Sequence, residues 1–124
     1  MITGIGTDII EIDRMRAAWA RRGMGLARRL LSASELTALL DQADPARFLA
    51  KRFAAKEALL KALGTGLRRG LRWTDMGVVN DTDGKPLLQL AGEAARLVGD
   101  RHCHLSLTDE RHYAVAFVII ESAS

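Results

Sequence analysis

The sequence has little of what marks secreted, membrane-spanning or base-stacking proteins. It contains a single cysteine, Cys103, so no intrachain disulfide can form, and a cytoplasmic location is expected. No apolar run approaches the roughly 20 residues that span a bilayer, and the N-terminus lacks the basic segment of a signal peptide. Aromatic residues make up only 5% of the chain and do not alternate with arginines, as stacking platforms for nucleic acid would.

What is present suits a small folded protein. The chain has 124 residues, of which 48% are hydrophobic and 27% charged, enough for one domain with one core. We therefore expect residues 1–124 to form a single domain. The hydrophobic pattern predicts a strand, then helices, then mostly strands, an order typical of α+β proteins.

The first expected strand covers residues 2–12. By its period of two, Gly4, Gly6 and Asp8 share one face. Isoleucines occur on both faces, so we expect the strand to be largely buried. Glycine weakens a strand and often marks close approach by a ligand or another backbone.

Capping residues mark the expected helices. Asp13 is expected to cap a helix that runs from Arg14 to about Arg22. The other signals are the capping-box spacing of Ser32 and Glu35, Asp44 with Pro45 at the start of a central helix, and Gly64 at its end. The remaining expected elements are a helical segment at 26–31, strands at 73–80, 85–90, 102–108 and 113–121, and a short helix at 92–98.

Basic residues are unevenly placed. The net charge is only +3, from 18 basic and 15 acidic residues. One stretch nevertheless holds six arginines and no acid: Arg14, Arg16, Arg21, Arg22, Arg28 and Arg29. Such a surface suits an acidic partner. A solvated helix face gives the same pattern, and charge alone favours that interpretation.

The central helix carries charges on a mostly apolar cylinder. At about 100° per residue, Glu57, Lys61 and Gly64 fall on one face, with Arg52 and Lys56 on the flanks. A Glu57–Lys61 salt bridge, which stabilises a helix by roughly 0.2–0.5 kcal/mol, is one explanation. A metal and phosphate site is the other, because charges in apolar surroundings are costly unless they pair or bind.

A second carboxylate extends the site hypothesis. Asp8 is either bonded to backbone N–H groups or ligates a hard cation, and Mg²⁺ is usually held by one or two carboxylates plus phosphates and waters. Asp8 and Glu57 would supply such a pair if the strand packs on the helix. The glycine-rich segment 64–70 offers N–H groups and two arginines as an anion cradle. His102 and His104 have no further ligands at zinc-site spacing, which favours a structural or phosphate-contacting role.

Several motifs together resemble those of one enzyme family. They are GIGTDI at 4–9, FLAKRFAAKEA at 48–58 followed by Lys61 and Gly64-Thr65-Gly66, Asn80-Asp81 through Gly84-Lys85-Pro86, HLSLT at 104–108, and Tyr113-Ala114. The chain resembles the holo-acyl-carrier-protein synthases, the small group of 4′-phosphopantetheinyl transferases, over nearly its whole length. The resemblance implies an antiparallel sheet packed on a long central helix.

The resemblance also implies an activity. Family members transfer 4′-phosphopantetheine from coenzyme A to a serine of apo-acyl carrier protein and leave adenosine 3′,5′-bisphosphate. By the family pattern, Asp8 and Glu57 hold Mg²⁺ against the pyrophosphate and Lys61 stabilises the same charge. Glu57, directly or through a water, is the candidate base for the serine hydroxyl. Fatty-acid or polyketide synthesis would use the product.

Further roles follow from the same resemblance. Arg52 and His104 would hold the nucleotide, and Gly64, Thr65 and Gly66 would approach the phosphates. The family forms homotrimers with sites between subunits. Arg14, a family docking position, would contact the acidic carrier protein, with Arg21, Arg22 and Arg28 as further candidates. Many relatives have a histidine where this chain has Asp109.

Two other functions compete with the transferase. One is a non-catalytic basic module that binds an acidic protein or nucleic acid. The other is a degenerate structural subunit, against which the intact Asp8, Glu57 and Lys61 argue. We expect neither a nucleic acid nor a membrane as partner.

Overall fold

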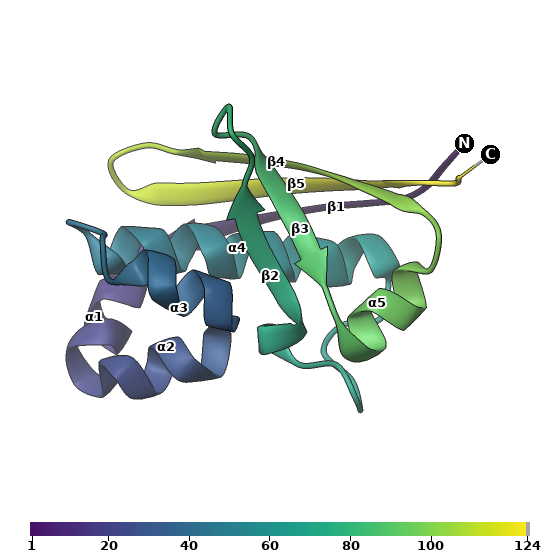
Figure 1. The fold of residues 1–124 in the computed structure, drawn as a ribbon. Helices are drawn as coiled ribbons and strands as arrows, with labels where there is room; N and C mark the ends of the chain where they lie inside the picture. The colour runs from purple at the N-terminus through teal and green to yellow at the C-terminus, as the bar shows by residue number, and fades with distance from the viewer. Residues whose placement is uncertain (124) are drawn as a thin grey trace.

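A long central helix and an antiparallel sheet organise the molecule. The computed structural model describes residues 1–123. Helix α4 (Pro45–Leu63) lies along one face of a three-stranded sheet in the order β1-β5-β4 (Figure 1). The strands are β1 (Ile2–Glu11), β4 (His102–Asp109) and β5 (Tyr113–Glu121). The predicted α+β fold, an antiparallel sheet packed on a central helix, is confirmed.

Three short helices cover the N-terminal half of α4. They are α1 (Ile12–Arg22), α2 (Met24–Leu30) and α3 (Ala33–Leu39). The predicted capping box of Ser32 and Glu35 is present, and Asp44 accepts a hydrogen bond from the backbone N–H of Arg47. Gly64 ends α4 in the left-handed conformation, with φ of 76°. These boundaries were predictable because each depends on residues close in sequence.

A hairpin and a fifth helix complete the chain. The hairpin pairs β2 (Met76–Asn80) with β3 (Pro86–Leu90), and α5 (Gly92–Val98) follows it. The prediction of a strand at 73–80 is wrong for the first three residues, which form the 3₁₀ turn η1 (Trp73–Asp75). There, the N–H of Asp75 bonds back to the carbonyl of Arg72. No helix within residues 1–123 is long and apolar enough to cross a bilayer.

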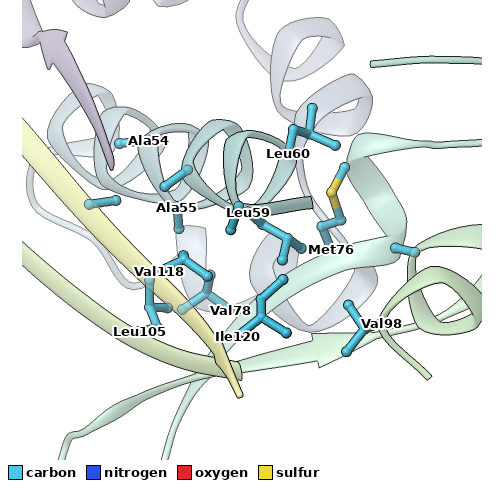
Figure 2. Close-up of a cluster of buried hydrophobic side chains, with 14 of the residues drawn as sticks. Ala54, Ala55, Leu59, Leu60, Met76, Val78, Val98, Leu105, Val118 and Ile120 are labelled. Atoms are coloured by element: carbon cyan, nitrogen blue, oxygen red, sulfur yellow. The ribbon is translucent and has the colours of Figure 1, made fainter. Parts of the chain in front are cut away.

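Two apolar clusters form the core. The first joins the C-terminal part of α4 to the sheet, the hairpin and α5; Figure 2 shows Leu59, Met76 and Val118 among its members. The second joins α1, α2 and α3 to the N-terminal part of α4. Helix α4 is therefore enclosed by these two clusters along most of its length.

Strand β1 touches the backbone of α4 directly. A Cβ atom on Gly4 would collide with the carbonyl oxygen of Ala62, and one on Gly6 with that of Ala58. The close approach predicted from these glycines is thus an approach to another backbone. Because Asp8 lies on the same strand face, this contact brings its side chain over α4.

Two further expectations, one about the N-terminal strand and one about the helix after it, were wrong. Helix α1 begins at Ile12, so Asp13 lies in its first turn and Glu11 is the N-cap residue. Ile12 is fully buried in the second cluster and its N–H bonds to the carbonyl of His112, so the helix begins two residues earlier than expected. The strand is also not buried on both faces: Ile5 and Ile9 are 60% and 62% exposed, because only one face of the sheet packs on α4.

Candidate active site

Asp8 and Lys61 form an ion pair across the strand–helix contact. The Lys61 Nζ atom lies 2.9 Å from Asp8 Oδ1 and donates a hydrogen bond to it. The Asp8 side chain is 14% exposed and that of Lys61 55%. Of the two explanations for the charged helix face, a Glu57–Lys61 bridge is not what forms: Lys61 pairs instead with the carboxylate that the strand supplies.

Glu57 lies close enough to Asp8 and Lys61 for both charges to shift its pKa. Burial raises the pKa of Glu57, the negative charge of Asp8 raises it further, and Lys61 opposes the shift. Two carboxylates therefore share this face with a single cation. The site has an excess of negative charge, which a bound cation would relieve.

The ligand set suits a magnesium ion better than a structural metal. Within residues 1–123, no group of three or more His, Cys, Asp or Glu side chains is placed to hold a metal. A closed zinc site needs four such ligands. Mg²⁺ needs only one or two carboxylates, because substrate phosphates and waters fill the other positions. Asp8 and Glu57 fit that requirement.

A glycine turn follows Lys61 at the end of α4. Gly64 and Gly66 have φ of 76° and 61°, and no atom outside the local backbone lies within 4 Å of a Cβ built on either. These glycines are thus needed for their backbone conformation rather than for close contact. The turn is exposed at the same end of α4 as Lys61, where a phosphate could meet both.

Arg52 and His104 lie in different places. Arg52 is buried, with its guanidinium 4.5 Å from the ring centre of Phe48, and it lines a cavity of about 280 Å³ with Arg47, Lys51 and Asn80. Within residues 1–123, its Nε atom has no hydrogen-bond partner. His104 instead lies on the open sheet face, 3.0 Å from Glu121. A single chain does not bring the two together.

Asp109 is anchored beside the same cavity. Its carboxylate oxygens lie 2.9 Å from Arg47 Nη1 and 3.2 Å from Lys51 Nζ. Asp109, where the resemblance implies a histidine, therefore holds two cations of the cavity wall.

A larger groove of about 780 Å³ lies between the end of β1 and helices α1 and α2. Its apolar lining includes Leu30, Phe53 and Trp73. Its basic lining is Arg14, Arg21, Arg22 and Arg29. Three of the four predicted docking arginines thus meet at one opening, whereas Arg28 is outside the lining and Arg29 takes its place.

The sequence did not predict the buried ion pair between Lys56 and Glu35. Lys56, predicted on a flank of α4, is 0% exposed and lies 2.7 Å from Glu35 Oε1. The only sequence signal was the capping-box position of Glu35. Nothing in the spacing shows that α3 folds back over this part of α4.

Comparisons with known proteins identify the family of this chain. The family model of the 4′-phosphopantetheinyl transferase superfamily matches residues 4–118. A holo-[acyl-carrier-protein] synthase of Vibrio vulnificus is 56% identical over 124 residues, covering 98% of both chains. The crystal structure of a holo-[acyl-carrier-protein] synthase from Neisseria meningitidis has 37% identity and a TM-score of 0.89, over 98% of this chain and 100% of that one. A Bacillus anthracis synthase in complex with CoA (3′,5′-ADP) has 35% identity and a TM-score of 0.85, over 99% of each chain. The chain belongs to the 4′-phosphopantetheinyl transferase superfamily.

Proposed function

We propose that this chain is a holo-acyl-carrier-protein synthase, one transferase domain that moves 4′-phosphopantetheine from coenzyme A to a serine of apo-acyl carrier protein. The observation that carries the proposal is the meeting of Asp8, Glu57 and Lys61 on one face of α4. This arrangement occurs in a chain 56% identical to a protein of that name. The product would serve fatty-acid biosynthesis.

Magnesium is part of the proposal. Asp8 and Glu57 would hold Mg²⁺, which supplies neutralisation of the negative charge on the pyrophosphate of coenzyme A. Lys61 adds a positive charge at the same face and, once released from Asp8, donates to a phosphate oxygen. Charge stabilisation of this kind is the main task in phosphoryl transfer.

The proton of the serine hydroxyl needs an acceptor. The serine oxygen forms a bond to the phosphorus that carries the pantetheine arm, and the bond from that phosphorus to the bridging oxygen breaks. Adenosine 3′,5′-bisphosphate leaves with the bonding electron pair. The proton passes to the Glu57 carboxylate, directly or through a water. In the metal-free protein, burial and then the charge of Asp8 raise the pKa of Glu57. A bound Mg²⁺ would oppose that rise.

A homotrimer would complete the nucleotide site. The open face of the three-stranded sheet exposes large apolar side chains of β1 and β5: Ile5, Ile9, Tyr113 and Phe117. Packing these faces together would bury them and bring His104 to a neighbouring subunit. Arg52 would then hold the nucleotide from one subunit and His104 from another, with Gly64, Thr65 and Gly66 near the phosphates.

The arginine-lined groove is the proposed docking site for the acidic carrier protein. Arg14, Arg21 and Arg22 line it, and Arg28 follows on α2. Added salt should weaken docking, because the Debye length is only about 8 Å at physiological ionic strength. The lone Cys103 fits the proposed cytoplasmic location.

Intact-mass spectrometry tests the activity. The purified protein with Mg²⁺ and coenzyme A should add about 340 Da, one phosphopantetheine group, to an apo-carrier protein. An unchanged mass with a carrier that a known synthase modifies would refute the enzyme and favour a non-catalytic basic module.

A further inference from the structure

The Glu35–Lys56 pair lies outside the proposed catalytic face and is the most deeply buried charged pair among the described residues. Lys56 is 0% exposed and Glu35 1%. A lysine ammonium has three N–H donors, and this one uses all of them. Its partners are Glu35 Oε1 at 2.7 Å, the carbonyl of Leu30 at 2.5 Å and the carbonyl of Trp73 at 2.9 Å.

Glu35 is equally well connected. Its Oε1 atom also accepts from the N–H of Ser32 at 2.9 Å, and its Oε2 atom from the N–H of Val78 at 3.0 Å. Because Lys56 belongs to α4, the pair ties that helix to the end of α2, the start of α3, η1 and β2. A second cation of α4, Arg52, has its Nε atom 3.6 Å from Glu35 Oε2.

Two of the three Lys56 contacts reach the wall of the groove. Leu30 and Trp73 both line it, and both are held through their backbone carbonyls. The Trp73 ring packs edge-to-face on that of Phe53, with the ring centres 4.9 Å apart. Phe53 lies one turn before Lys56 on α4 and lines the same groove. The floor of the groove is thus fixed to α4 immediately beside Glu57.

We propose that Lys56 is a positioning residue for carrier-protein docking: by tying the backbone of Leu30 and Trp73 to α4, it sets the shape of the groove and its place relative to Glu57. The inference rests on the proposed function, since it concerns the groove through which the protein substrate would bind.

A purely stabilising role is the competing explanation. Replacing a buried ion pair by neutral groups of similar volume often leaves stability unchanged or raises it, whereas removing one partner is strongly destabilising. Burial lowers the pKa of Lys56, and the charge of Glu35 opposes that shift. If charge balance is all that the pair supplies, a neutral pair should restore both stability and docking.

Two variants separate these roles: Lys56→Met, and the charge-neutral pair Glu35→Gln with Lys56→Met. Both remove the donors to Leu30 and Trp73, but the second leaves no unpaired carboxylate. Because Glu35 Oε2 also lies 3.6 Å from Arg52 Nε, Glu35→Gln alone, which keeps the Lys56 donors, is the reference for the loss of that contact. Relative to Glu35→Gln, we expect the double variant to raise KM for carrier protein by at least about fivefold, with KM for coenzyme A changed by less than about twofold. Arg96→Met is the control, because it removes a cation that pairs with Glu93 on α5 and that lines neither the groove nor the Arg52 cavity. It should leave KM for carrier protein unchanged.

A second readout does not depend on the activity. In a Trp19→Phe background, acrylamide quenching reports on Trp73 alone, and it should increase in the double variant but not in the Arg96 control. Wild-type protein that transfers no phosphopantetheine would refute the proposed function, while quenching would still test the positioning role.

The double variant decides the inference even where Lys56→Met alone does not fold. A carrier-protein KM and a Trp73 quenching constant both equal to wild type would overturn it. So would an equal rise in KM for both substrates.

Discussion

Replacing Lys61 by methionine should strengthen magnesium binding while it impairs transfer. In the free protein Lys61 donates to Asp8 at 2.9 Å, so it occupies the carboxylate that the metal would use. The hydrogen bond to Asp8 raises the pKa of Lys61, so the lysine is charged and must be displaced at any pH used for assay. Methionine keeps the aliphatic length and removes the competing cation.

The expected gain is modest because the pair is partly exposed. Exposed ion pairs contribute about 0.2–1 kcal/mol, which sets an upper limit of about fivefold on the improvement in Kd for Mg²⁺. The effect on kcat should be opposite in sign and larger. Loss of one preorganised group that stabilises transition-state charge typically costs about 10²–10³ in rate.

Isothermal titration of metal-free protein with MgCl₂ at pH 8 and low ionic strength measures the first effect without any turnover. Arg96→Met is the control, because it removes the cation of another exposed ion pair, with Glu93 on α5. Magnesium affinity that falls in Lys61→Met, or that rises equally in the control, would refute competition between Lys61 and the metal at Asp8.

Four further predictions follow. Glu57→Gln should raise the Tm of metal-free protein at pH 7 but not at pH 4. Because the pKa of Glu57 is raised in the folded protein, its charged form opposes folding, and that penalty disappears once the group is protonated. Equal Tm shifts at both pH values would contradict the assignment. Gly6→Ala should lower the free energy of unfolding by about 1–3 kcal/mol through collision with Ala58, whereas Gly25→Ala, which meets open space in α2, should not; urea denaturation distinguishes them. Arg14→Glu should raise KM for carrier protein by about fivefold and leave that for coenzyme A nearly unchanged, and steady-state kinetics showing an equal rise in both would place Arg14 away from the docking groove. Phe117→Asp puts a charge on the open sheet face and should convert the proposed trimer to monomers in light scattering; a wild-type protein that is already monomeric would refute the trimer.

Local signals predicted much of the fold. Ser32 with Glu35, Asp44 with Pro45, and Gly64 act on residues within one helical turn, so their effects depend little on the rest of the molecule. The glycines of β1 predicted a close backbone approach, and that approach places Asp8 over α4.

Features that depend on distant packing were not predictable. Lys56 became buried because α2, α3 and η1 fold over it, and no periodicity within α4 encodes that cover. The choice between Glu57 and Asp8 as partner of Lys61 depends on how β1 lies along the helix. The exchange of Arg28 for Arg29 in the groove similarly reflects the orientation of α2.

The most direct test of the catalytic face is a crystal structure with Mg²⁺ and coenzyme A bound. We expect one ion with a carboxylate oxygen from each of Asp8 and Glu57 at about 2.0–2.1 Å, and Lys61 Nζ moved from Asp8 to a phosphate oxygen. An ion that contacts neither carboxylate, or a Lys61 still bonded to Asp8 with substrate in place, would contradict it.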